Sequence, residues 1–182
     1  MQVRDADPRT DAAACAAIYA PFVSASAVSF DETPLTADAF ARKIETLSAQ
    51  FPFIVSVADD GAVTGYAYAS PYRERSAYRW SCESSVYVHD AFRGQGVGTL
   101  LYETLIDLLR RQGVRVVVAG ITQPNPGSMA LHRRCGFRHV GTFERIGFKH
   151  GAWRDVAFVS LQLGSADDDA PPAELRRPVR LA

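Results

Sequence analysis

The chain has 182 residues, 47% of them hydrophobic, which is enough for one domain with a sizeable core. Its 20 basic and 20 acidic side chains cancel, so no overall field draws nucleic acid or an anionic membrane to it. Its three cysteines, odd in number and far apart, argue against a disulfide framework and a cysteine-based zinc site. No apolar run approaches the length of a membrane span, and the first residues lack the order of a secretion signal. We therefore expect a metal-free cytoplasmic protein without nucleic-acid or membrane partners.

The first part of the chain predicts one strand and two helices. An aspartate followed by a proline marks a helix start, because aspartate accepts from free N–H groups and proline suits the first turn. Apolar residues at helical spacing predict a second helix after Thr36. In chain order we expect a short strand over 2–4, an Ala-rich helix from Asp7 and Pro8 to about Tyr19, an irregular stretch over 21–34, and the helix that Thr36 caps.

Strands dominate the rest of the chain. Two β-rich runs flank Asp59-Asp60-Gly61, which is the pattern of a hairpin. Residues 115–121 are nearly all valine and alanine, as in a strand that is covered on both faces. The remaining expected elements are strands over 80–89, 137–148 and 154–163 and helices over 97–111 and 125–135.

This order of elements predicts an α/β fold of the α+β kind, a mixed sheet of about six to seven strands with helices on both faces. The fold occupies one domain, residues 1–164. Beyond Gly164 the chain is rich in aspartate, proline and arginine and cannot bury a core. We therefore expect residues 165–182 to form a disordered or loosely docked tail.

The segment Arg93-Gly94-Gln95-Gly96-Val97-Gly98, between a strand and a helix, carries the strongest chemical signal. Its glycines let the backbone approach a ligand and leave the first helical N–H groups free. Together with the helix dipole and Arg93, these donors suit a phosphate or pyrophosphate. A P-loop would need Lys-Ser or Lys-Thr after its last glycine, where this chain has Thr99-Leu100, and a Rossmann turn would need Gly-x-Gly-x-x-Gly. Both of these nucleotide sites are therefore excluded by spacing.

The pattern Arg-x-x-Gly-x-Gly resembles the pyrophosphate loop of the GNAT superfamily of N-acetyltransferases. An Asn125 that opens a helix ending before Gly136-Phe137 resembles the second signature of that superfamily. The ordinary alternatives are a glycine-rich turn with a solvated arginine and an asparagine that only caps its helix. The runs at 28–30, 72–78, 83–88 and 149–156 are similar to the phosphinothricin acetyltransferase family, which includes enzymes that acetylate methionine sulfoximine and methionine sulfone.

The resemblance implies the GNAT fold, acetyl-CoA as cosubstrate, no metal, a homodimer, and direct attack by the α-amine of a small amino acid in a ternary complex. In GNAT proteins the strand before the glycine loop carries a bulge that splays it from its neighbour, and the amide arm of the cofactor pairs with the freed edge. The cofactor contacts that the resemblance implies are Val86, Tyr87, Val88, Arg93, Gly94, Gln95, Gly96, Val97, Gly98, Thr99, Asn125 and Ser128.

Acyl transfer needs a neutral amine, so a group that takes the amine proton accelerates it by about 10²–10⁴. Glu83 is an acid in an otherwise uncharged run, where burial would raise its pKa, and the matching glutamate of the family is the general base. The alternative is a solvent-facing or salt-bridged glutamate. The thioester carbonyl oxygen gains negative charge during the attack, and a backbone N–H near Val88 would stabilise this oxyanion. His132 stands where many GNAT enzymes have a tyrosine that protonates the thiolate, so it would be an acid, a second base or a packing residue.

Arg73 and Arg75 are candidates for binding the acceptor, because two guanidiniums on one strand face would clamp a carboxylate and a second acid group. The alternative is a solvated charge run. Phe30 would form an apolar wall, and Tyr78 and Lys149 complete the expected acceptor site. For Lys149 the alternatives are a dimer contact and ordinary packing. Other acceptors, such as a peptide N-terminus or an aminoglycoside, stay open, although the arginine pair argues against a polycation. A non-catalytic acyl-CoA-binding module is the alternative of another class, against which Glu83 argues.

Overall fold

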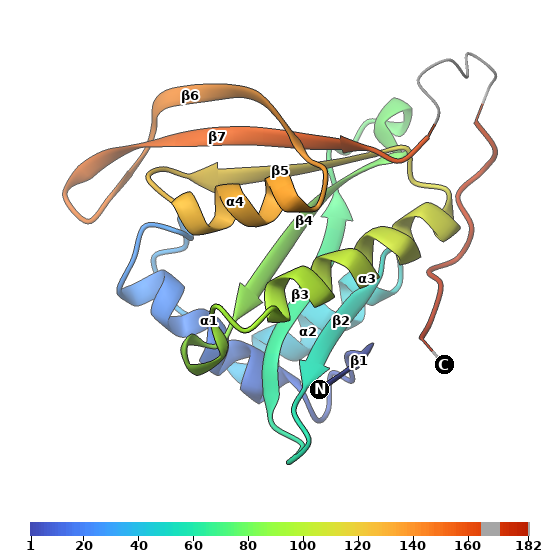
Figure 1. The fold of residues 1–182 in the computed structure, drawn as a ribbon, viewed down its shortest axis with the longest axis horizontal. Coiled ribbons are helices and arrows are strands. Elements are labelled where there is room, and N and C mark those ends of the chain that lie inside the picture. Colours follow the sequence, from blue (N-terminus) through green and yellow to red (C-terminus); the bar gives the residue numbers. More distant parts are fainter. Residues whose placement is uncertain (165–171, 182) are drawn as a thin grey trace.

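The computed structural model describes residues 1–164 and 172–181. Its middle layer is a seven-stranded sheet of order β1-β2-β3-β4-β5-β7-β6 (Figure 1). Only β4 and β5 run parallel, and every other neighbouring pair is antiparallel. The predicted mixed sheet is therefore confirmed. The strands are β1 (Gln2–Asp5), β2 (Phe53–Val57), β3 (Val63–Pro71), β4 (Ser81–Val88), β5 (Val116–Thr122), β6 (Arg138–Lys149) and β7 (Ala152–Gln162).

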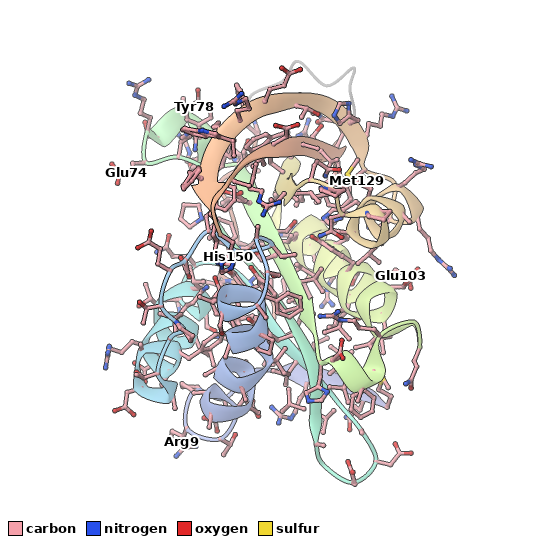
Figure 2. All side chains as sticks on the ribbon, turned by 90° about the vertical axis from the view of Figure 1, so that its left-hand side faces the viewer. Arg9, Glu74, Tyr78, Glu103, Met129 and His150 are labelled. Atoms are coloured by element: carbon pink, nitrogen blue, oxygen red, sulfur yellow. The ribbon has the colours of Figure 1, made fainter. Side chains whose placement is uncertain are left out.

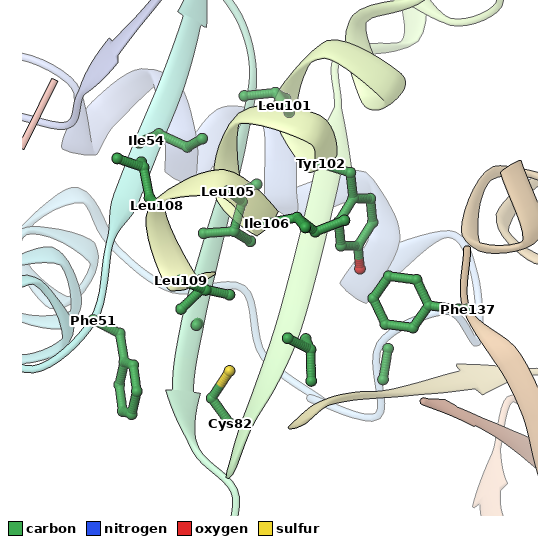
Figure 3. Packing of buried hydrophobic residues seen from close by; sticks show 14 of the residues in the cluster. Phe51, Ile54, Cys82, Leu101, Tyr102, Leu105, Ile106, Leu108, Leu109 and Phe137 are labelled. Carbon is green, nitrogen blue, oxygen red and sulfur yellow. The ribbon is translucent and has the colours of Figure 1, made fainter. Parts of the chain in front are cut away.

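Helices cover both faces of the sheet. On one face, α1 (Ala12–Ser24) and α2 (Ala37–Ser48) pack on an aromatic layer from β2 and β3. On the other, α3 (Val97–Gln112) buries a leucine stripe, with α4 (Pro126–Arg134) beside it (Figure 3). Each fully buried leucine of α3 contributes about 1.5–3 kcal/mol of hydrophobic free energy. Two short 3₁₀ helices, η1 (Ser76–Tyr78) and η2 (Asp90–Phe92), flank β4. Within the described ranges, no helix is both long and apolar enough to span a bilayer.

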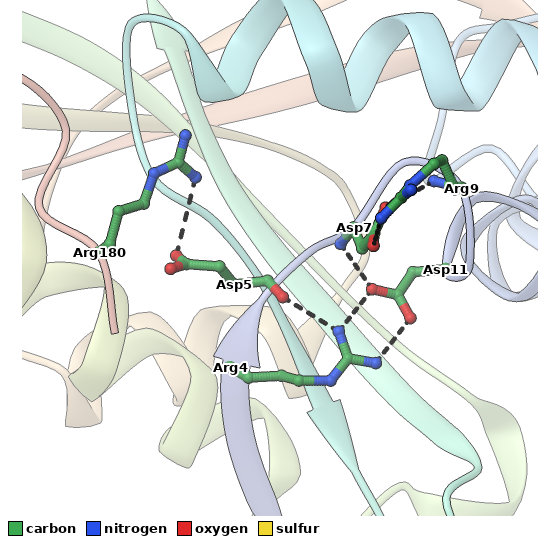
Figure 4. A network of polar contacts seen from close by, with 6 residues as sticks. All are labelled: Arg4, Asp5, Asp7, Arg9, Asp11 and Arg180. Carbon is green, nitrogen blue, oxygen red and sulfur yellow. Dashed lines mark hydrogen bonds and ion pairs between the residues drawn. The ribbon is translucent and has the colours of Figure 1, made fainter. Parts of the chain in front are cut away.

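The first helix differs from its prediction at both ends. It begins at Ala12 rather than after Asp7, because the buried carboxylate of Asp11 accepts from both terminal nitrogens of Arg4, at 2.6 and 2.7 Å (Figure 4). It then continues through Pro21 to Ser24, where the expected irregular stretch had begun. Pro21 lies in the last turn, so its missing N–H removes only one helical bond.

The expected tail falls into two parts. Residues 165–171 lie outside the described residues. Residues 172–181 run along α3 to β1, where Leu175, Val179 and Leu181 pack against the hydrophobic cluster around α3. The Leu181 N–H donates to Asp5 at 3.0 Å, and Arg180 forms an ion pair with the same carboxylate (Figure 4).

Candidate active site

A cleft opens where β4 and β5 separate. The two strands pair in parallel only from Ser81–Val116 to Glu83–Val118, and beyond these pairs they diverge (Figure 1). The cleft between them encloses about 60 Å³ and is lined by both strands and by α4. The ladder between β3 and β4 keeps one register along its whole length, so the bulge that the resemblance implied is absent from it. The strands separate because β4 stays paired with β3 while β5 turns away to follow β7.

The open edge of β4 presents backbone donors to the cleft. His89 donates its N–H to the carbonyl of Thr64 at 2.9 Å, on the β3 side. Because successive strand residues direct their N–H groups to opposite edges, those of Val88 and Val86 face β5. In the described part of the chain, no β5 residue pairs with them. The backbone of Tyr87 also lines the cleft, whereas its ring packs against Tyr19 on the other side of the sheet.

The glycine loop leaves free N–H groups at the start of α3. Gly94 and Gly96 have φ of +74° and +84°, a region that glycine enters at little cost. The first helical bond runs from the Leu100 N–H to the Gly96 carbonyl at 3.0 Å. A Cβ at Gly96 would meet no atom within 4 Å, so the space in front of the loop is open. Residues 1–164 and 172–181 offer no acceptor to the N–H groups of the first turn, which belong to Val97, Gly98 and Thr99.

Gly98 has a second role. A Cβ there would lie 3.1 Å from a methyl group of Leu131, so glycine lets α4 pack closely against α3. Arg93 directly precedes the loop, and its guanidinium is turned toward α1, where it pairs with Asp90 at 3.0 Å and lies over the Phe22 ring. The Gln95 side chain donates to the Ala91 carbonyl at 2.8 Å and steadies the loop. The structure thus places the predicted glycines at a strand-to-helix turn with free N–H groups and open space in front of them.

Asn125 and Ser128 lie on the α4 side of the cleft. The Asn125 side chain accepts from the Ser128 N–H at 3.1 Å, so Asn125 does cap the helix as its alternative interpretation held. Both residues also line the cleft, so capping and ligand contact are compatible.

His132 is buried at the bottom of the cleft and uses both ring nitrogens. Its Nδ1 lies 2.7 Å from the Ser128 carbonyl, which requires a proton on Nδ1, so Nε2 accepts from the Tyr102 hydroxyl at 2.8 Å. Burial lowers the pKa of His132, which favours this neutral form. The Tyr102 hydroxyl also lies 3.2 Å from the Ser84 hydroxyl. Tyr102 and Ser84 were not predicted, since Tyr102 occupies a core position of α3 and only its hydroxyl reaches the cleft.

Glu83 is the last β4 residue paired with β5, so it lies where the cleft begins. It is half-buried, and this burial raises its pKa, while the nearby positive charge of Arg73 opposes the rise. A carboxylate with a raised pKa at the closed end of the cleft is suited to accept a proton. No group of three His, Cys, Asp or Glu side chains within 1–164 and 172–181 is placed to hold a metal.

Arg73 and Arg75 do not lie on a strand. They belong to the connection between β3 and η1, both are exposed, and the shared strand face on which the clamp depended does not exist. Arg73 lies over the Tyr72 ring and near Glu83. Tyr78 is exposed at the outer edge of the molecule (Figure 2).

Phe30 and Lys149 belong to one assembly, in which Lys149 has a different role from the one expected. The Phe30 ring lies against Gly147, where any Cβ would overlap it. The Lys149 ammonium is buried and donates to the carbonyls of Val23, Ser29 and Asp31 at 2.6, 2.6 and 2.8 Å. With three donors and three acceptors, it has no N–H left for an acceptor molecule. Lys149 therefore holds the loop that carries Phe30.

Replacing Lys149 by methionine is expected to lower the free energy of unfolding by about 2–3 kcal/mol, because buried carbonyls would lose a charged donor. Urea denaturation measures this loss. Lys43→Met is the control, since the Lys43 ammonium donates to a neutral hydroxyl, that of Tyr68, and lies over the rings of Tyr19, Phe40 and Tyr68, against which methionine can still pack. This variant should cost about 1 kcal/mol. Equal losses in both variants would contradict the anchoring role of Lys149.

Known proteins share this architecture and sequence. Residues 18–137 match the family model described as the acetyltransferase (GNAT) family. A phosphinothricin N-acetyltransferase of Streptomyces viridochromogenes is 36% identical over 180 residues, covering 99% of this chain and 93% of that protein. An L-methionine sulfoximine/L-methionine sulfone acetyltransferase of Salmonella typhimurium is 37% identical over 175 residues, covering 94% and 98%.

A crystal structure of a GNAT superfamily phosphinothricin acetyltransferase from Sinorhizobium meliloti, in complex with acetyl-CoA, superposes with a TM-score of 0.89. It is 36% identical, and the match covers 95% of this chain and 93% of that chain. The family match, the identities over nearly the whole chain and the splayed β4–β5 cleft agree with one another. This chain belongs to the GNAT family of acetyltransferases.

Proposed function

We propose that this protein transfers the acetyl group of acetyl-CoA to the α-amine of a small amino acid or analogue, of the phosphinothricin, methionine sulfoximine or methionine sulfone type. The observation that carries the proposal is the cleft between β4 and β5, which opens directly after the Glu83–Val118 pair, together with the free helical N–H groups where the chain continues from β4 into α3. The names of the Streptomyces and Salmonella relatives support the acceptor class.

The cosubstrate would be held from two sides. The free N–H groups of the first turn of α3 and the positive end of its dipole suit the pyrophosphate, and Arg93 adds a positive charge directly before the loop. The open edge of β4 suits the amide arm, since its N–H groups have no β5 partner. Asn125 and Ser128 line the opposite wall.

The reaction would proceed by direct attack. Glu83 takes a proton from the ammonium, directly or through water, and the neutral nitrogen then forms a bond to the thioester carbon. The N–H groups of Val86 or Val88 stabilise the oxyanion, and its collapse breaks the C–S bond. During this collapse the attacking nitrogen would lose its second proton and the thiolate would gain one, relayed through the Tyr102 hydroxyl or water. Neutral His132 would orient the Tyr102 hydroxyl, because its Nε2 accepts the hydrogen bond that this hydroxyl donates.

We further propose that the protein acts in the cytoplasm as a homodimer. The β6–β7 hairpin exposes an apolar patch whose members are each at least 52% exposed, and such patches mark contact surfaces. The Phe148 and Trp153 rings pair across the two strands, with centroids 5.5 Å apart. The patch consists of Phe148 and Trp153. Val140, Phe143 and Ile146 are also exposed on this hairpin, but Phe143 lies on its opposite face, because its partner Val156 is an odd number of residues from Trp153.

Replacing Phe148 by glutamate is expected to convert the dimer to a monomer, because it places a charge in the apolar patch. Light scattering after size-exclusion chromatography measures the mass. Thr142→Glu is the control, since Thr142 is exposed on the same hairpin outside the patch. A monomeric wild type, or a dimeric Phe148→Glu variant, would contradict this interface.

Thiol release from acetyl-CoA tests the proposed reaction. We expect release with methionine sulfoximine, methionine sulfone or phosphinothricin, and less with ordinary amino acids. A peptide as the best acceptor would favour a peptide N-terminal acetyltransferase instead. Tight acetyl-CoA binding without release for any amine would favour a non-catalytic acyl-CoA-binding module.

A further inference from the structure

A cavity of about 460 Å³ adjoins the β4–β5 cleft. Its walls come from the end of α1 and the following loop, from the end of β5, and from the turn of the β6–β7 hairpin. Val28 and Thr122 line both this cavity and the cleft, so the two spaces meet. We call it the hairpin cavity.

Two hydrogen bonds connect the walls of the hairpin cavity. The Thr122 hydroxyl donates to the Val28 carbonyl at 3.4 Å, and the His150 ring lies 3.2 Å from the Ser26 carbonyl. His150 therefore lies beside the end of α1 (Figure 2). Hydrogen bonds between separate segments therefore hold the walls of the hairpin cavity in place.

Arg154 lines this cavity from the sheet face that also carries Glu83. Glu83 pairs with Val118, and Val118 shares its face with Thr122 because alternate strand residues point the same way. Thr122 pairs with Val156, and Arg154 lies two residues before Val156 on the same strand. The side chain of Arg154 thus projects to the face on which the proposed base lies.

The Arg154 side chain has neither a hydrogen-bond partner for its Nε nor a neighbouring carboxylate among the described residues that line the hairpin cavity. Its Nε is buried and has no hydrogen-bond partner among the described residues. The described residues that line the cavity include no aspartate or glutamate. Its strand partner is Gly147, whose missing side chain makes room for the Phe30 ring. A buried guanidinium donor in a cavity without carboxylates is suited to the carboxylate of a small molecule.

We infer that Arg154 binds the carboxylate of the acceptor in the hairpin cavity and so determines specificity for amino acids. The inference rests on the proposed function, since it supposes that the amine points into the adjoining cleft. It gives Arg154 the role that the sequence favoured for Arg73 and Arg75, which lie exposed on the β3–η1 connection.

Steady-state kinetics of Arg154→Leu test this anchor. We expect KM for methionine sulfone to rise more than about tenfold, with KM for acetyl-CoA within about twofold of wild type. Arg154→Lys should recover part of the loss, because it restores the charge without the planar fork. Arg138→Leu, an exposed arginine of the same hairpin, is the matched control and should leave KM unchanged.

The carboxamide of methionine sulfone separates an acid anchor from a general disturbance of the site. This neutral acceptor should show the same KM in wild type and in Arg154→Leu. The inference is overturned if the variant loses both acceptors equally, if it loses neither, or if Arg75→Ala shows the selective loss instead.

Calorimetric titration of the CoA-loaded protein with methionine sulfone separates this inference from the proposed reaction. Binding by wild type that Arg154→Leu loses supports the anchor even if no acetyl transfer is found. Transfer by wild type with undiminished binding in Arg154→Leu overturns the anchor and leaves the proposed function standing. A wild type that neither binds nor acetylates methionine sulfone overturns both.

Discussion

Replacing Glu83 by glutamine is expected to lower kcat by about 10²-fold or more while acetyl-CoA binding stays nearly unchanged. Glutamine keeps the shape of the side chain but cannot take a proton from the ammonium. Stopped-flow or steady-state thiol release with methionine sulfone measures kcat, and calorimetry measures acetyl-CoA affinity. Glu103→Gln, an exposed glutamate of α3, is the matched control. A Glu83→Gln variant within about threefold of wild-type kcat would remove Glu83 from the mechanism.

The same variant has a signature in the pH profile. Burial raises the pKa of Glu83 above its ordinary value of 4.5, and the base is active only as the carboxylate. Wild-type kcat should therefore rise with pH through this raised pKa. The acidic limb of the profile should disappear in Glu83→Gln. Persistence of the limb would assign it to another group.

Replacing Gly96 by valine is expected to weaken acetyl-CoA binding by more than about tenfold. Gly96 has φ of +84°, where a β-branched residue is strained, and it is the residue at which α3 begins. The added side chain would also project into the open space in front of the free N–H groups. Calorimetry with acetyl-CoA measures the change.

Gly61→Val controls for backbone strain. Gly61 has φ of +87°, a Cβ there would meet no atom within 4 Å, and the residue lies in the β2–β3 turn away from the cleft. The variant should lose stability while keeping its affinity for acetyl-CoA. Unchanged affinity in Gly96→Val, or an equal loss in Gly61→Val, would place the pyrophosphate elsewhere.

Local sequence signals predicted most of the fold. Hydrophobic spacing and turn signals located the seven strands and the four α-helices but not the two short 3₁₀ helices, and the apolar stripe of α3 follows from spacing alone. The expectation that β5 is covered on both faces was wrong, because only its alternate residues Val117, Ala119 and Ile121 are buried. The glycine loop was also predictable, because a phosphate site at a helix start needs residues that are adjacent in the sequence. The first helix was misplaced because Asp11 pairs with Arg4 of β1, which is a contact between elements.

The remaining parts of the site depend on contacts between distant segments. Lys149 bonds to carbonyls more than a hundred residues away, so no local pattern distinguishes it from a substrate-binding lysine. Tyr102 and His132 meet only because Gly98 lets α3 and α4 approach. The position of Arg154 relative to Glu83 follows from the strand order β4-β5-β7, which the sequence does not contain.

A crystal structure with CoA and methionine sulfone bound together would test the central claim most directly. The account predicts the pyrophosphate on the N–H groups of Val97 to Thr99, the amide arm along β4, and the acceptor amine directed toward the cleft that Glu83 closes. A diphosphate bound away from the start of α3, or a β4–β5 cleft without the amide arm, would contradict it.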